Sequence, residues 1–213
     1  RPRRHGSEVS LSGPHDVSVA RTVLVGVTGG IAIYKSVELV RGLVKDGLRP
    51  LVVTTEAAQR FVMPLTFAAA SQAPVLDDQS AWQGSGGWFR HIEAARAASV
   101  MVVAPATANT LAKMATGIAD NLLTATYLAF RGPVIVAPTM NWAMHQHDAT
   151  QHNLRLLADR GVEVLPTELV SHVLASSEPV AIIEYQREHF ASAAGSLRVT
   201  LDYDLAFYDQ TGG

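Results

Sequence analysis

The chain has 213 residues, a formal net charge of −2 and no cysteine. The lack of cysteine excludes disulfides, thiolate metal ligands and a cysteine nucleophile from this sequence. The nearly neutral charge does not indicate a nucleic-acid partner, and no segment approaches the roughly 20 apolar residues of a membrane span. Hydrophobic residues make up 48% of the sequence and charged residues 17%, which favours a folded chain whose surface is partly covered by other subunits.

Residues 1–20 differ in composition from the rest of the chain. Arg1, Arg3 and Arg4 begin a polar stretch, and no apolar segment follows that could serve as a secretory signal. We therefore predict a disordered N-terminal arm over residues 1–20 and a cytoplasmic protein.

Short apolar runs alternate with helical patterns from residue 21 onward. The runs that we expect to form strands are 22–27, 51–53, 100–104, 134–137 and 162–165. The helical patterns cover 31–45, 109–130 and 148–160, and residues 56–71 are expected to form one or two short helices. Pro64 suits the first turn of a helix, and residues 73–90 are expected to form a loop. This alternation is typical of an α/β fold, so we predict a Rossmann-like (flavodoxin-like) parallel sheet with helices on both faces over residues 21–166.

The pattern changes after Pro166. Residues 199–205 alternate between apolar and polar side chains, as one strand of an antiparallel hairpin does. We predict an appended C-terminal hairpin within residues 167–213.

Glycines and small polar residues, together with Ile31 and Ala108, follow the first four predicted strands. They are Gly29, Gly30, Ile31, Thr54, Thr55, Thr107, Ala108, Asn109, Thr110, Thr139 and Asn141. Ligands of parallel sheets bind outside the carboxyl ends of the strands, and glycines there let backbone amides approach an anion at a helix N-terminus. A tight turn with helix caps would explain the first loop equally well. The two threonines after the second strand stand where a dinucleotide-binding fold usually has an acidic residue, which weakens an interpretation as an NAD site.

Four segments in chain order resemble the flavin-containing cysteine decarboxylases. This family includes phosphopantothenoylcysteine decarboxylases and the peptidyl-cysteine decarboxylases of ribosomal peptide biosynthesis. The segments are residues 25–32 (VGVTGGIA), 90–93 (RHIE), 106–110 (ATANT) and 138–144 (PTMNWAM). Thr107 replaces the usual serine of the third segment, and His145 follows the fourth where tryptophan is usual. The resemblance extends over residues 21–165.

The resemblance implies FMN as the cofactor, bound at a subunit interface of a homotrimer or of a dodecamer built from four trimers. It implies that the FMN phosphate lies on Gly29, Gly30 and Ile31, with Thr54 and Thr55 nearby. It implies contacts to the rest of the flavin from Thr107, Ala108, Asn109, Thr110 and Thr139. His91 would act as acid/base on the substrate thiol, Asn141 would hold the substrate carboxylate, and Met144 would border the substrate.

Other histidines could suggest a metal site. His145, His147 and His152 have no acidic or cysteine partner at a convincing ligand spacing, so we expect no metal.

Ser176 bears on the expected product. In the coenzyme A branch of the family, a late cysteine helps to reduce an enethiol to a thiol, and residues 174–178 (LASSE) resemble the segment that carries it, with Ser176 in its place. The resemblance therefore favours oxidative decarboxylation of a C-terminal cysteine of a precursor peptide to an aminoenethiol, with the C-terminal hairpin as a substrate clamp. The alternatives are a phosphopantothenoylcysteine decarboxylase, a flavin prenyltransferase and a non-catalytic FMN-binding subunit.

Overall fold

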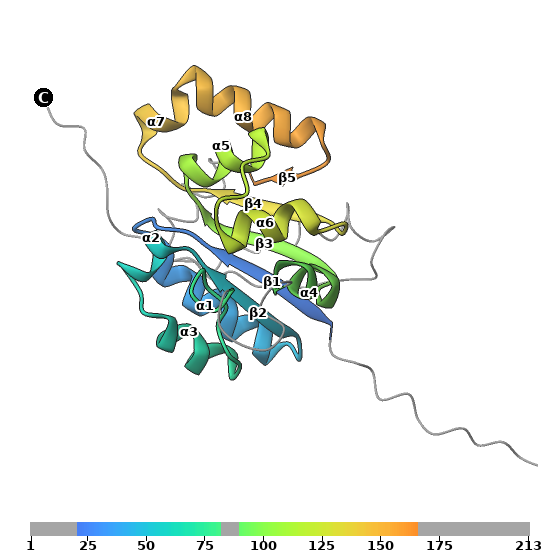
Figure 1. Ribbon diagram of the computed structural model, residues 1–213. Helices are drawn as coiled ribbons and strands as arrows, with labels where there is room; N and C mark the ends of the chain where they lie inside the picture. Colours follow the sequence, from blue (N-terminus) through green and yellow to red (C-terminus); the bar gives the residue numbers. More distant parts are fainter. Residues whose placement is uncertain (1–20, 82–89, 166–213) are drawn as a thin grey trace, which may run out of the picture.

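The computed structural model describes residues 21–81 and 90–165 (Figure 1). Five parallel strands form one sheet in the order β2-β1-β3-β4-β5. The strands are β1 (Thr22–Val27), β2 (Arg49–Thr54), β3 (Val100–Ala106), β4 (Val134–Pro138) and β5 (Glu163–Val164). The five expected strands and the flavodoxin-like α/β fold are thus confirmed. Strand β2 lies on one side of β1, and β3, β4 and β5 lie on the other, so the strand order switches between β1 and β3.

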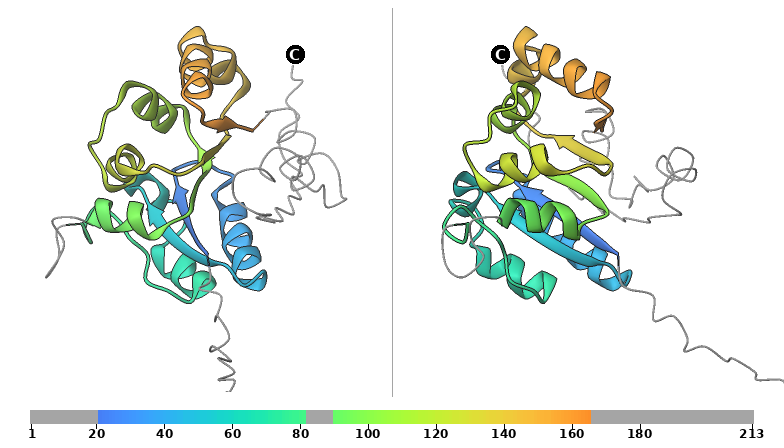
Figure 2. Two further views of the ribbon diagram at one scale, coloured as in Figure 1. Left: turned by 90° about the vertical axis from the view of Figure 1, so that its right-hand side faces the viewer. Right: turned by 45° about the vertical axis from the view of Figure 1, so that its right-hand side comes forward.

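Helices cover both faces of this sheet (Figure 2). One face carries α1 (Ile33–Lys45), with α3 (Pro64–Ser71) beside it. The other face carries α4 (Arg90–Ala97), α5 (Ala108–Thr116), α6 (Leu122–Ala129) and α8 (Asp148–Asp159). Two short helices, α2 (Glu56–Gln59) and α7 (Trp142–Gln146), follow the carboxyl ends of β2 and β4. Pro64 occupies the first turn of α3, as expected.

The central strands are almost entirely apolar because helices lie on both of their faces. Successive strand residues point to opposite faces. In β1, Val23 and Val25 pack with the α1 side of the core, whereas Leu24 packs with the side that carries α4 to α6 and α8. All three side chains are completely buried. The two clusters together form the core that holds the carboxyl edge of the sheet in place.

The prediction of a single helix over 109–130 is wrong. The structure has two helices here, α5 and α6, because Gly117 ends α5 in the left-handed conformation with φ of 76°. Asn121 then starts α6, since its side-chain oxygen accepts a hydrogen bond from the Thr124 amide at 2.9 Å. Two other helices were not expected: α4 begins at the last residue of the predicted loop, and α7 follows β4.

Several predictions fall on residues that the structure does not describe. These are the N-terminal arm, the C-terminal hairpin and Ser176. Among the residues that are described, no helix is long and apolar enough to cross a membrane.

Asp78 joins the loop after β2 to the start of α6. Its Oδ1 accepts a hydrogen bond from the Leu122 amide at 2.6 Å. Burial raises the pKa of the Asp78 carboxyl, and the nearby carboxylates of Asp77, Asp120 and Glu56 raise it further, against the lowering effect of the Leu122 amide. The folded protein therefore binds the Asp78 proton more tightly than the unfolded chain does.

We expect Asp78→Asn to raise the free energy of unfolding near neutral pH. A carboxyl whose pKa is raised by folding stabilises the fold in its protonated form, and this contribution is lost as the pH rises through the raised pKa. The amide oxygen of asparagine can still accept from Leu122, so the gain should shrink toward acid pH, where Asp78 is protonated. Urea denaturation at several pH values measures this difference in the free energy of unfolding. Asp78→Ala, which removes the acceptor, should cost about 1 kcal/mol, and an equal loss in Asp78→Asn at neutral pH would contradict the prediction.

Candidate functional site at the carboxyl edge of the sheet

The loops after the first four strands are hydrogen-bonded to one another. The Thr55 amide after β2 donates to the carbonyl of Val27 at the end of β1 (3.1 Å). The Thr107 amide after β3 donates to the hydroxyl of Thr28 after β1 (3.1 Å). The Thr139 amide after β4 donates to the carbonyl of Ala106 at the end of β3 (3.1 Å). These bonds make one continuous surface of the predicted site loops.

Helix α1 lacks a side-chain cap at its N-terminus, which faces this surface. Its N-cap residue, Ala32, makes no side-chain hydrogen bond, and no acidic residue lies in its first turn. By contrast, side chains cap α2, α5, α6, α7 and α8. The free amides and the dipole at the start of a helix of 13 residues favour an anion.

The two glycines before α1 have different surroundings. A Cβ on Gly29 would lie 2.7 Å from the Cβ of Ala57 and 2.8 Å from its backbone carbon and oxygen, so α2 packs directly on the Gly29 backbone. A Cβ on Gly30 would have its nearest neighbours, Pro105 and Thr107, at an ordinary 3.7 Å. Ile31 follows with 72% of its surface exposed, although it is a large apolar residue. Of these two glycines, Gly29 is therefore the one that packing requires.

The threonines of the predicted site divide into buried and accessible ones. Thr54 is 1% exposed, and its hydroxyl lies 3.5 Å from the Leu76 carbonyl, so it holds the loop after β2. Thr110 is also buried, and its hydroxyl lies 3.2 Å from that of Thr107. Thr55 and Thr107 are partly exposed, and both are N-caps, of α2 and α5. Hydroxyls at these two positions reach the shared surface, together with the first residues of α5, Ala108 and the exposed Asn109.

The loop after β4 brings an amide and apolar side chains to the same edge. Asn141 is exposed, and its side-chain oxygen accepts a hydrogen bond from the Ala143 amide at 2.9 Å, which caps α7. This bond leaves the side-chain NH2 group to donate to a ligand. Thr139, whose hydroxyl lies 3.2 Å from the Ala137 carbonyl, precedes it. Met144 and Trp142 are 52% and 68% exposed, so neither belongs to the core.

His91 is not brought to this surface within one chain. It lies in the first turn of α4, is half-buried, and belongs to a helix that packs on α6 and contacts β1. Helix α4 ends shortly before β3 begins at the amino edge of the sheet (Figure 1). Its eight residues span about 12 Å, whereas the seven residues of β3 span about 23 Å. His91 therefore lies at most about halfway along the sheet.

Two of the other histidines, His145 and His147, have structural contacts. His145 stacks on Trp142 with ring centroids 6.0 Å apart, and the His147 ring accepts from the Ala149 amide as the cap of α8. Within 21–81 and 90–165, no group of three histidines, aspartates or glutamates could hold a metal ion.

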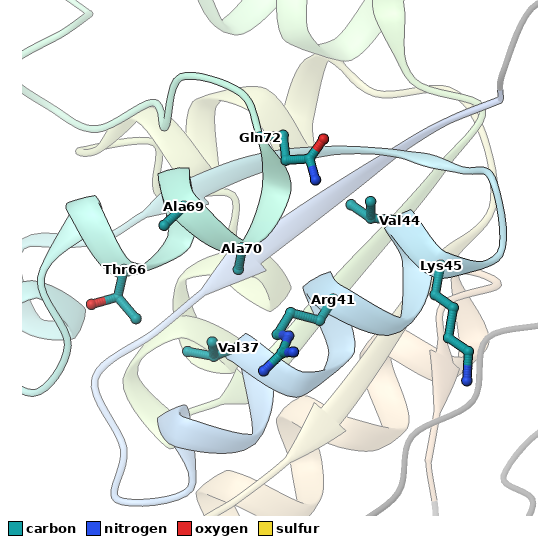
Figure 3. Close-up of a pocket in the computed structure, with 8 residues that line it drawn as sticks. All are labelled: Val37, Arg41, Val44, Lys45, Thr66, Ala69, Ala70 and Gln72. Carbon is teal, nitrogen blue, oxygen red and sulfur yellow. The ribbon is translucent and has the colours of Figure 1, made fainter.

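A groove between α1 and α3 lies away from the predicted site (Figure 3). Its lining residues are Val37, Arg41, Val44, Lys45, Thr66, Ala69, Ala70 and Gln72. Its lining residues on α1 begin at Val37, about 6 Å along the helix axis from the uncapped end, and extend to Lys45 at the other end of the helix, about 18 Å from it. The groove therefore does not extend the site at the carboxyl edge.

Two residues of the edge were not expected as site residues. Thr28 and Ser36 are each 1% exposed, and both hydroxyls bond to carbonyls at the end of β3. A hydroxyl residue on the apolar face of the 31–45 helical pattern was the sequence signal for Ser36. Thr28 lies in the 25–32 segment that carries the family resemblance, but no role was predicted for its side chain.

Comparison with known proteins gives a consistent result. The Flavoprotein family matches residues 12–189 of the chain. The coenzyme A biosynthesis bifunctional protein CoaBC of Bacillus subtilis is 41% identical over 177 residues, which is 80% of this chain and 43% of that protein. The protein of the same name from Mycobacterium bovis is 45% identical over 147 residues, 69% of this chain and 34% of that protein. The chain thus spans less than half the length of these curated relatives.

Solved structures agree with the sequence comparisons. The FMN-dependent cysteine decarboxylase TvaF from thioviridamide biosynthesis superposes with a TM-score of 0.65 and 34% identity, covering 72% of this chain and 94% of that one. A cysteine-to-serine mutant of PPC decarboxylase, complexed with pantothenoylaminoethenethiol, superposes with a TM-score of 0.63 and 31% identity, covering 70% of this chain and 82% of that one.

Proposed function

Because this chain belongs to the Flavoprotein family, with FMN as its cofactor, we propose that it removes the carboxylate of a cysteine residue at the end of its substrate. The observation that carries the proposal is one shared edge, where the uncapped start of α1 lies with the free amide NH2 of Asn141. The start of α1 suits the phosphate of a cofactor, and the Asn141 NH2 group can donate a hydrogen bond to the carboxylate of a substrate bound next to it.

The residues at the edge fit FMN. The proposed phosphate position lies against Gly29, Gly30 and Ile31 before α1, where the Gly30 amide already donates to the Thr28 carbonyl (3.0 Å) and the amides of Gly29 and Ile31 would face the phosphate. The hydroxyl of Thr55, the N-cap of α2, lies at the same edge of the sheet. Thr107 and Asn109 at the start of α5 offer polar contacts to the remainder of the cofactor. Further proposed flavin contacts come from Ala108, Thr110 and Thr139, whereas the buried Thr54 supports the fold of its loop.

The protein's part in the chemistry is to orient the substrate and to move a proton. Bound FMN supplies the two-electron oxidation of the substrate's carbon–sulfur unit, after which the oxidised group can accept the electrons released as CO2 leaves. Asn141 donates to the carboxylate without adding a charge, Met144 gives an apolar wall, and His91 exchanges the proton of the thiol.

His91 has to reach the site from a neighbouring copy of the chain. Within one chain, α4 keeps His91 away from the α1 N-terminus and from Asn141. Large apolar side chains are exposed at the edge, including Ile31, Tyr34, Trp142 and Met144. A second subunit that covers them would bring its own His91 to the cofactor, and a closed ring of such contacts gives a homo-oligomer such as a trimer or a dodecamer of four trimers.

Two substrates are consistent with this site. Phosphopantothenoylcysteine is favoured by the CoaBC relatives and by the PPC decarboxylase structure, so we place it first. A precursor peptide ending in cysteine, which the sequence put first, is favoured by the absence of cysteine from the chain. With serine in place of a reducing thiol, either substrate should end as an enethiol, and the cysteine-to-serine mutant of PPC decarboxylase holds an aminoethenethiol.

We expect the FMN-loaded protein, incubated in air with phosphopantothenoylcysteine, to give a product that has lost CO2 plus two hydrogens. Mass spectrometry measures this, with a peptide ending in cysteine as the parallel substrate. Ser176→Cys should shift the product toward loss of CO2 alone, whereas the matched control Ser177→Cys should not. Turnover of the peptide alone would select the second substrate, and no mass change on either would overturn the proposed function.

A further inference from the structure

The last carbonyls of β3 lie where the strand pairing is interrupted. Pairing between β1 and β3 runs as far as Gly26 opposite Val103. On the other side, the register between β3 and β4 is irregular between Val103 and Ala106. The carbonyls of Ala104 and Pro105 fall within this interruption, so a regular ladder does not satisfy them.

Two buried hydroxyls from the β1–α1 segment take the place of the missing ladder. The Ser36 hydroxyl donates to the Ala104 carbonyl at 2.7 Å, and the Thr28 hydroxyl donates to the Pro105 carbonyl at 2.5 Å. The Thr28 oxygen also accepts from the Thr107 amide at 3.1 Å. A hydroxyl can donate and accept at once, and no apolar side chain of similar size can replace either function.

These three bonds connect the two loops that the cofactor has to span. Thr28 directly precedes Gly29 and Gly30, and Thr107 is the N-cap of α5. A Cβ on Gly30 would be in ordinary van der Waals contact, at 3.7 Å, with the side chains of Pro105 and Thr107. The distance between the start of α1 and the start of α5 is thus set by the Thr28 hydroxyl, with Ser36 further along, in the first turn of α1.

We propose that Thr28 and Ser36 are positioning residues. They hold residues 28–31, the proposed phosphate loop, at a fixed distance from the loop at the start of α5. FMN, which contacts both loops, gains affinity from this fixed spacing, whereas a ligand that contacts one loop does not. The inference rests on FMN binding and not on the proposed substrate, and flavin titration tests it even if the decarboxylase assignment fails.

Titration of the apoprotein with FMN and with riboflavin, which has no phosphate, tests the proposal by flavin fluorescence. Thr28→Val should weaken FMN binding about tenfold or more, as expected for the loss of two buried hydrogen bonds. It should weaken riboflavin binding much less, and Thr28→Ser should restore FMN binding. The matched control is Thr126→Val, because the hydroxyl of the fully buried Thr126 donates to the Leu122 carbonyl at 2.7 Å within α6.

Equal weakening of FMN and riboflavin in Thr28→Val, or an equal loss of FMN affinity in Thr126→Val, would overturn the proposal. In that case Thr28 would contribute only to stability. If Thr28→Val does not fold, Ser36→Ala decides, because it removes a single hydrogen bond and should still lower the preference for FMN over riboflavin. An unchanged preference in Ser36→Ala would then overturn it.

Discussion

Replacing His91 with asparagine is expected to lower decarboxylation about 10²- to 10⁴-fold, the usual effect of losing a general acid or base. Asparagine keeps a polar side chain of similar size on α4, so the fold and the flavin content should be unchanged. Product formation by mass spectrometry and flavin absorbance of the purified variant measure the two quantities. Turnover within a few-fold of the unaltered protein would place the proton transfer on another group.

A second variant tests the substrate carboxylate. Asn141→Asp keeps the oxygen that caps α7, since aspartate is an equally good cap, but it replaces the free NH2 group with a negative charge. We therefore expect the fold and the bound FMN to remain, while substrate binding fails through repulsion of its carboxylate. Asn141→Ala removes the α7 cap as well as the NH2 group. Comparing the two variants therefore separates the loss of stability of α7 from the loss of substrate binding.

Mixing the two inactive variants tests whether one site draws on two chains. If His91 and Asn141 of one site belong to different subunits, a mixed oligomer of His91→Asn and Asn141→Asp contains some sites with both residues intact. Random assembly of equal amounts leaves about one quarter of the sites intact, so about a quarter of the activity should return after the variants are co-refolded or co-expressed. If both residues came from the same chain, every site would lack one of them and no activity would return.

The strands could be predicted because their physical cause is local. The segment 22–27 is apolar throughout and is followed by Thr28 and two glycines, so its limits were given correctly. The break between α5 and α6 also has a local cause, because Gly117 ends the first helix and Asn121 caps the second. It was missed because the apolar periodicity continues on both sides of it. The continuity of an apolar pattern is therefore weaker evidence for one helix than a glycine and a cap are for two.

The site could be predicted only in part, because its geometry depends on contacts between distant parts of the chain. Residues 29–31, 107–110 and 139–141 lie at one edge, as parallel strands require. The bond between Thr28 and Pro105 joins residues 77 positions apart, and no local pattern indicates it. Thr54 was grouped with Thr55 because they are adjacent, yet adjacent residues at a strand end point to opposite sides and only one reaches the surface.

Adding one methyl group at Gly29 is expected to damage the site more than adding one at Gly30. In Gly29→Ala, the new Cβ would lie 2.7–2.8 Å from the Cβ and backbone of Ala57, and backbone atoms cannot rotate away. The phosphate loop and α2 would have to separate, at a cost of about 1–3 kcal/mol for overpacking. Because we propose that this loop binds the FMN phosphate, FMN affinity should fall about tenfold or more.

Gly30→Ala is the matched control, since its Cβ would have no neighbour closer than 3.7 Å. Its free energy of unfolding, measured by urea denaturation without flavin, should equal that of the unaltered protein, whereas that of Gly29→Ala should be lower. If Gly30→Ala nevertheless binds FMN more weakly at unchanged stability, the space beside Gly30 is filled by the cofactor itself. Equal stability and equal FMN affinity in Gly29→Ala would contradict the direct packing of α2 on the phosphate loop, and with it the rigid start of α1 on which an anion site depends.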